Sequence, residues 1–132
     1  MSQENVEVVR EMMAAAQRGD FAGLVEIIGP EFELHENVLA PDAAVYHGPE
    51  GLKKWLEAGL EAFSDFRFEP ERFIEQGDWV FALVHAHGRG RGSGAPFDRR
   101  YVTAFKFHLG KIVFAASYED LPEALEAVGL SE

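Results

Sequence analysis

A carboxylate follows an apolar strand pattern in the first third of the chain. Residues 31–37 (EFELHEN) alternate between apolar and polar types, which predicts a strand with Phe32, Leu34 and Glu36 on one face. A carboxyl group in apolar surroundings has a raised pKa, which suits it to abstract a proton. We therefore predict Glu36 as a general base. His35 falls on the opposite face by alternation, but strand ends twist, so it is either a catalytic partner of Glu36 or a surface residue.

Two histidines offer a second kind of chemistry. His85 and His87 stand two residues apart on one predicted strand, a spacing that can chelate a metal ion. A protein metal site needs at least one further ligand, and no third one is identifiable from the sequence. We therefore predict no metal site and no cofactor.

The elements that must position these residues follow from periodicity and from turn residues. Apolar spacing predicts a helix over 3–18, ended by Gly19, and Asp20 is placed to cap a short helix over 21–28. After the strand over 31–37, the remaining elements are a loop over 38–48, a helix over 49–63, strands over 66–75, 79–91, 97–109 and 112–118, and a helix over 121–128. Helices that precede a run of antiparallel strands predict the α+β class.

Length, composition and charge limit the possibilities further. The 132 residues are the usual size of one domain, and we treat 1–132 as a single domain. The net charge of −11 repels phosphate backbones, so nucleic acid is excluded as a partner. The chain has no cysteine, and neither a signal peptide nor a membrane span is recognisable, which predicts a cytoplasmic protein without membrane contact. The basic residues between 89 and 111 form either a solvated hairpin edge, which we favour, or a docking site.

Several stretches together resemble one known family over nearly the whole chain. They are NVEVVREMMAAAQRGDFAGLVEII, FELHEN, HGPEGLKKWL, GDWVFALVHAHGRGRGSG and GKIVFAASYEDLPEALEAVGL. The sequence resembles the SnoaL-like branch of the nuclear transport factor 2-like superfamily. The resemblance implies a cystatin-like α+β barrel, in which an N-terminal helical hairpin and one long helix close a cone-shaped, curved antiparallel sheet around a small apolar pocket. The family includes polyketide cyclases, ketosteroid isomerase, limonene epoxide hydrolase and scytalone dehydratase, and its members mostly use no cofactor.

The resemblance to ketosteroid isomerase covers only part of that enzyme's site. Glu36 matches the position of the base. The tyrosine of the oxyanion hole would fall near Met12, which has no proton to donate, and the second acid would fall near Thr103, which is a weak hydrogen-bond donor. The sequence therefore retains the base and loses most of the oxyanion hole.

Two other chemistries of the family find little support. Epoxide hydrolysis needs charged residues at positions near Val84, Ala86 and Ser117, and none of these is charged. The cyclases use an acid late in the sheet, where the nearest acids are Glu119 and Asp120. Asp120 is either that acid or the N-cap of the last helix, and we favour the cap.

The family also implies which face of the sheet looks into the cone. Its usual orientation turns Val84 inward, which places His85 and His87 on the outer surface. The substrate-binding residues predicted on this basis are Leu34, Tyr46, His47, Trp55, Val84, Thr103, Phe105 and Ser117. For Trp55, a place in the core is the alternative to lining the pocket, and for Tyr46 and His47 it is simple loop packing.

Three functions remain open. The first is a cofactor-independent cyclase, isomerase or dehydratase that acts on a small apolar carbonyl compound with Glu36 as base. The second is a protein that binds a small hydrophobic molecule without chemistry. The third is a homodimer that pairs through the outer sheet face and has a vestigial pocket, suggested by apolar strand residues beyond one small core. These residues are Trp79, Phe81, Leu83, Phe105 and Phe107. We rank the enzyme slightly first.

Overall fold

Helices at both ends of the chain flank a six-stranded sheet in the computed structural model, which describes residues 2–36 and 45–130. The helices are α1 (Ser2–Arg18), α2 (Phe21–Ile27), α3 (Gly48–Ala62) and α4 (Leu121–Ala127). The strands are β1 (Ile28–His35), β2 (Val45–His47), β3 (Phe63–Gln76), β4 (Trp79–Gly90), β5 (Pro96–His108) and β6 (Lys111–Tyr118). None of the helices in this described part is long and apolar enough to cross a membrane.

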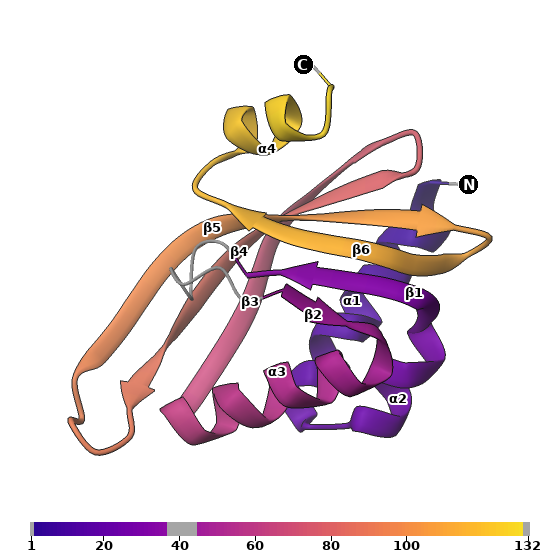
Figure 1. Cartoon of the computed structure of the whole chain (residues 1–132). Helices are drawn as coiled ribbons and strands as arrows, with labels where there is room; N and C mark the ends of the chain where they lie inside the picture. Colours follow the sequence, from indigo (N-terminus) through magenta and orange to yellow (C-terminus); the bar gives the residue numbers. More distant parts are fainter. Residues whose placement is uncertain (1, 37–44, 131–132) are drawn as a thin grey trace.

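The sheet is curved and does not close into a full barrel (Figure 1). Its strand order is β2-β1-β6-β5-β4-β3, and the α+β class is confirmed. Several details differ from the sequence-based expectation. Strands β1 and β3 begin three residues earlier than predicted, at Ile28 and Phe63. Residues 45–47, predicted within the loop over 38–48, form β2. Residues 37–44 lie outside the described residues, and they include Asn37, the predicted end of the first strand. The pairing of β1 with β6 is parallel rather than antiparallel, because the chain returns to β1 only after the whole β3–β6 meander.

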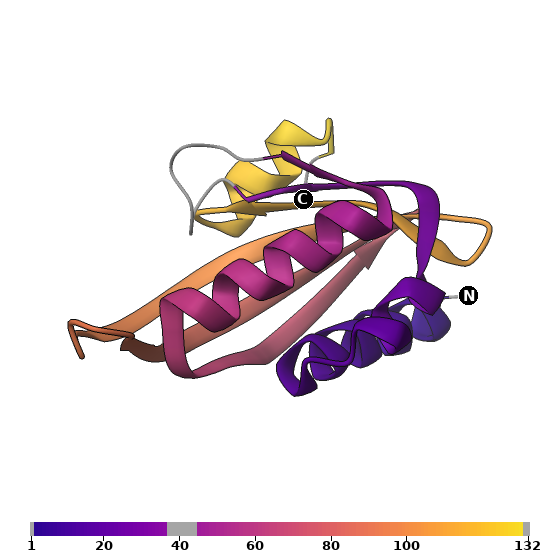
Figure 2. The same ribbon diagram turned by 60° about the horizontal axis from the view of Figure 1, so that its bottom comes forward.

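The two faces of the sheet are covered differently. Figure 2 shows α1, α2 and α3 on one side of the sheet and α4 on the other. On β4, Val80 and Val84 belong to the main core beneath α1 and α3, so this face is the inner one. Because side chains alternate along a strand, His85 and His87 lie on the outer face, as the family's orientation implied.

A glycine ends the first helix, and two aspartate side chains cap the starts of two others. Gly19, with a φ of 71°, follows α1, and the Asp20 side chain accepts a hydrogen bond from Gly23 N at 3.0 Å at the start of α2. The Asp120 side chain accepts from Glu123 N at 2.9 Å at the start of α4. Both caps predicted from the sequence are confirmed, which leaves Asp120 in a structural role.

The apolar residues that suggested a pairing surface are mostly used inside the chain. Phe105 and Phe107 belong to the inner core, and Phe81 is fully buried in a second cluster on the outer face. This second cluster includes Ala124 and Leu125 of α4. The last helix therefore covers the apolar part of the outer face that the sequence left available for a partner.

Candidate functional site

The Glu36 carboxylate is buried and held by two hydrogen-bond donors. Its residue is 7% exposed and follows β1 directly. Trp55 Nε1 donates to Glu36 Oε2 at 2.8 Å, and Ser117 Oγ donates to Glu36 Oε1 at 3.1 Å. Hydrogen bonds donated to a carboxylate favour its ionised form, which is the form that can accept a proton. The arrangement therefore fixes both oxygens of a candidate base.

Three elements bring these side chains together. In the parallel pairing of β1 with β6, His35 lies opposite Ala116, which places the next residues of the two strands, Glu36 and Ser117, side by side. Trp55 comes from α3, whose Leu52 and Leu56 are buried against the sheet. The contact between Glu36 and Ser117 spans 81 positions of sequence, so it depends on the whole sheet being formed.

A cavity of about 350 Å³ opens beside Glu36 between α1, α3 and β3. Its lining consists of Ala16, Gln17, Glu36, Tyr46, Trp55, Leu56, Ala58, Gly59, Leu60, Ala62, Phe63, Asp65, Phe66, Phe68 and Arg91. Most of these residues are apolar. The polar members Gln17, Asp65 and Arg91 are exposed, whereas Glu36 is buried, so the carboxylate marks the inner end of the cavity.

A second cavity of about 60 Å³ continues into the core. It is lined by Met12, Met13, Ala16, Leu34, Glu36, Leu52, Trp55, Phe68, Val84, Tyr101, Thr103, Phe105, Ala115 and Ser117. Glu36, Trp55 and Phe68 border both spaces. The candidate base thus stands where an apolar molecule in the larger cavity would meet the sheet.

Tyr101 adds a proton donor to the smaller cavity. It is 6% exposed, and burial together with the nearby charge of Glu36 raises the pKa of its phenol. The hydroxyl therefore stays protonated at neutral pH and can donate a hydrogen bond to a ligand oxygen. Alternation with Thr103 and Phe105 places Tyr101 on this face, which is the signal that could have included it among the predicted site residues.

Eight of the ten predicted site residues line these cavities. Glu36 and Trp55 border both, Tyr46 borders the larger, and the smaller contains Leu34, Val84, Thr103, Phe105 and Ser117.

The two exceptions are histidines, which the structure places outside these cavities. His35 keeps the strand alternation and lies on the opposite face, where its Nε2 is 3.0 Å from Glu33 Oε1 and its ring packs 4.9 Å from Phe114. His47, whose side chain is 69% exposed, lies 3.9 Å from the Glu33 carboxylate. Neither is among the described residues that line the two cavities.

Two polar residues of the cavity had no signal in the sequence. The Gln17 side-chain amide donates to Phe66 O at 2.6 Å and accepts from Phe68 N at 2.7 Å, which ties the end of α1 to β3. Arg91 Nε donates to Leu60 O at 2.8 Å, which ties the turn after β4 to α3. Their partners lie 49, 51 and 31 positions away, so no local pattern could have indicated these contacts.

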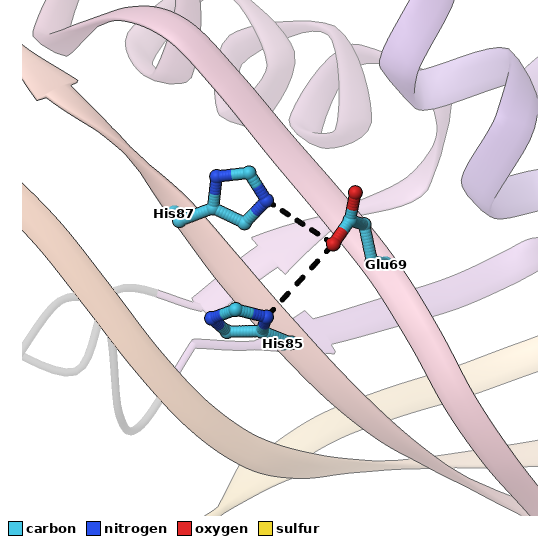
Figure 3. Close-up of side chains that lie close together, drawn as sticks. All are labelled: Glu69, His85 and His87. Carbon is cyan, nitrogen blue, oxygen red and sulfur yellow. Dashed lines mark ion pairs between the residues drawn. The ribbon is translucent and has the colours of Figure 1, made fainter.

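The outer face carries the donor set that the sequence left incomplete. Glu69 of β3 lies beside His85 and His87 of β4, and one Glu69 oxygen is within 4.0 Å of a ring nitrogen of each (Figure 3). The sequence identified no third group near the two histidines, and in the structure a carboxylate lies beside both. The third group stands on the neighbouring strand, and its position depends on a strand register that the sequence does not reveal.

Comparison with known proteins identifies the family. The family model of the SnoaL-like domain matches residues 9–115, and the chain belongs to this family. No curated protein matches the sequence.

Solved structures with the same architecture agree with this assignment. An NTF2-like protein from Burkholderia xenovorans LB400 is 28% identical, with a TM-score of 0.80 over 91% of this chain and 92% of that one. A protein proposed to be a SnoaL-like polyketide cyclase, from Jannaschia sp. CCS1, is 21% identical, with a TM-score of 0.78 over 98% and 94% of the two chains. TerC, co-crystallised with polyporic acid, is 20% identical, with a TM-score of 0.78 over 96% and 97%. These likenesses support the cone-shaped NTF2-like fold.

Proposed function

We propose that this protein binds a small apolar carbonyl compound in the larger cavity and acts on it without a cofactor, with Glu36 as general base. The observation that carries the proposal is a buried carboxylate, fixed by Trp55 and Ser117, at the inner end of an apolar cavity. A volume of about 350 Å³ lies within the range of small-molecule sites. The SnoaL-like family assignment and neighbours described as polyketide cyclases support a cyclase-type role.

The proposed step is removal of a proton from the carbon next to the carbonyl. Glu36 takes the proton, the electron pair of the broken C–H bond moves toward the carbonyl, and an enolate forms. A carbonyl oxygen that reaches from the larger cavity into the smaller one would accept a hydrogen bond from Tyr101 while the negative charge develops on it. Return of the proton at another carbon gives an isomer. Attack of the enolate on a second carbonyl gives a ring, and loss of a β-hydroxyl as water gives a dehydrated product.

This step can be tested without the natural substrate. In D₂O, a general base exchanges the α-hydrogens of an enolisable ketone for deuterium, which proton NMR detects. With 2-tetralone as the probe, we expect the protein to accelerate exchange and Glu36→Gln to lower the rate by about 10²–10⁴-fold, the usual contribution of a general base. The matched control is Glu33→Gln, which removes a carboxylate from the opposite face of the same strand and should leave the rate unchanged.

The same experiment separates the enzyme from the non-catalytic binding protein. Quenching of tryptophan fluorescence by 2-tetralone reports binding near Trp55, which borders both cavities. Quenching without exchange would support a binding protein for small hydrophobic ligands instead. Exchange that persists in Glu36→Gln would refute the role of Glu36. A cytoplasmic location and a homodimer through the outer sheet face stay predictions, the latter with less apolar surface than the sequence suggested.

A further inference from the structure

The outer face of the sheet holds a converging set of two histidines and a glutamate. Among the described residues, Glu69, His85 and His87 form the one group in which three such ligand atoms lie within 4.8 Å of one another. His87 Nε2 lies 3.2 Å from Glu69 Oε1, and His85 Nδ1 lies 3.8 Å from the same oxygen. Figure 3 shows both rings turned toward this carboxylate.

Strand register explains why the three groups meet. Glu69 lies directly opposite His85 in the antiparallel β3–β4 pair, and His87 is the diagonal neighbour on the same face. The histidine rings lie against each other, with centroids 4.9 Å apart. Two ligands bonded to a tetrahedral Zn²⁺ at about 2.0–2.1 Å stand about 3.3 Å apart. The present distances therefore need only small side-chain rotations to accept an ion.

Asp98 of β5 supplies the support that such sites usually have. Its Oδ1 lies 3.0 Å from His85 Nε2, the ring nitrogen that faces away from Glu69. A carboxylate on one ring nitrogen holds the proton there and leaves the other nitrogen free to bind a metal. His85 is thus held from both sides, by Asp98 at Nε2 and by Glu69 at Nδ1, and its side chain is only 18% exposed.

The neighbouring charges permit a cation. Arg67 lies opposite His87, and Arg100 lies opposite His85. Arg100 is already paired with Glu71, with its Nε 3.1 Å from the carboxylate, so its charge is compensated. Arg89, two residues after His87 on the same face of β4, is a third arginine, and its guanidinium donates to Gly94 O at 3.1 Å. The three carboxylates Glu69, Glu71 and Asp98 balance the three arginines, within a chain of net charge −11.

We propose that Glu69, His85 and His87 bind one divalent transition-metal ion of the Zn²⁺ type, with Asp98 orienting His85. Two imidazoles and one carboxylate match the donors that Zn²⁺ prefers, and three protein ligands leave a fourth position for water or another ligand. The ion would join the edge strand β3 to β4. The site lies on the opposite face from the cavity and does not depend on the function proposed for Glu36.

Titration of the tag-free, full-length protein with CoCl₂ and ZnCl₂ tests this site. Bound Co²⁺ is followed by its visible absorption, and Zn²⁺ by calorimetry. We expect one equivalent of each ion to bind, and His87→Ala and Glu69→Gln to weaken binding by at least about tenfold. Asp98→Asn should weaken it by about 10–100-fold, as for other carboxylates that orient a ligand histidine. Zn²⁺ should also raise the melting temperature of the wild type more than that of Glu69→Gln, because binding to the folded state stabilises it.

A second set of the same residue types provides the control. Glu33, His35 and His47 also place one carboxylate beside two histidines, but they are not a converging group within the described part of the chain. His35→Ala should therefore leave Co²⁺ and Zn²⁺ binding unchanged. Circular dichroism of each variant shows whether it folds, and Glu69→Gln preserves side-chain size at an exposed position. Affinity that survives both His87→Ala and Glu69→Gln, or binding without saturation at one equivalent, would overturn the proposal.

Discussion

At the residue scale, the candidate site depends on a few polar groups in an apolar setting. Glu36 has a fixed donor for each oxygen, and Tyr101 places a second kind of proton donor in the adjoining cavity. A buried carboxylate is costly unless it is hydrogen-bonded, so Trp55 and Ser117 both stabilise Glu36 and orient it. The same contacts that make the carboxylate compatible with the core thus hold it in one orientation toward the cavity.

The raised pKa of Tyr101 leads to a pH-dependent prediction. Burial and the charge of Glu36 raise it above the ordinary 10.0 in the folded state, so the folded protein retains a proton that the unfolded chain releases. Below about pH 10 this group does not change the free energy of unfolding with pH. Above that pH it should lower the free energy of unfolding by about 1.4 kcal/mol per pH unit. Urea unfolding between about pH 9 and 11.5 measures this slope.

Replacement of Tyr101 isolates its contribution from those of other groups. We expect Tyr101→Phe to lose stability with rising pH less steeply than the wild type. Tyr118→Phe should have a smaller effect, because Tyr118 is only half-buried, although burial and Glu123 raise the pKa of Tyr118 as well. Equal slopes for the wild type and Tyr101→Phe would mean that the phenol ionises with its ordinary pKa and is not enclosed as the structure has it.

At the element scale, α3 positions both Trp55 and the edge strand β2. Gly51 lies where α3 meets β2, and a Cβ at this position would stand 2.8 Å from the Tyr46 carbonyl carbon. Gly59, in the same helix, has no such neighbour within 4 Å. One helix therefore contains a glycine required for close packing and a glycine that is not.

These two glycines should respond to alanine in opposite directions. Gly51→Ala should lower the free energy of unfolding by about 1–3 kcal/mol, because the methyl group forces β2 away from α3. Gly59→Ala should raise it by about 0.5–1 kcal/mol, because alanine favours the helix and meets no obstacle. Urea denaturation of both variants provides the comparison. Stabilisation by Gly51→Ala would contradict the close packing of β2 on α3 at this position.

Elements formed by local pattern were predictable, whereas contacts set by register were not. Periodicity and turn residues predicted the helices, the long strands and both aspartate caps, and alternation placed Leu34 and Glu36 on the inner face. The strand β2 was missed because three residues are too few to show a period, and the strand forms only by pairing with β1. Its partner strand also pairs with β6 in parallel, across more than 80 positions of sequence, and no local signal encodes such a pairing.

In the candidate sites, too, local patterns were readable from the sequence and contacts set by strand register were not. Alternation grouped residues such as Val84 and Thr103 by face, and the family resemblance implied that this face looks into the cone. For His35 the sequence left open whether the twist of the strand end turns it toward Glu36 or leaves it on the surface, and in the structure it keeps the alternation and lies on the opposite face. Glu69 was missed as a partner of the histidines because it becomes their neighbour only through the β3–β4 register.

At the scale of the whole molecule, one sheet separates two candidate sites with different residue types. The inner face, beneath α1 and α3, holds the cavity and Glu36, whereas the outer face holds α4 and, apart from it, the cluster of Glu69, His85 and His87. Inner and outer residues follow each other directly on two strands: Phe68 and Glu69 on β3, and Val84 and His85 on β4. Coupling between the two candidate sites would pass most directly through these stretches of strand.

We expect the two sites to be independent, because consecutive side chains of a strand point to opposite faces and share no contacts. His87→Ala should leave the rate of 2-tetralone exchange within about twofold of the wild type, and Glu36→Gln should leave Zn²⁺ affinity within the same range. For each quantity, the exchange rate and the Zn²⁺ affinity, the change in free energy of the double variant should equal the sum of the changes in the two single variants to within about 0.5 kcal/mol. Coupling would be seen if added Zn²⁺ changed the exchange rate of the wild type but not that of His87→Ala. This result would mean that an ion on the outer face shifts β3 and, with it, Phe68 in the wall of the cavity. The sheet would then connect the two sites rather than separate them.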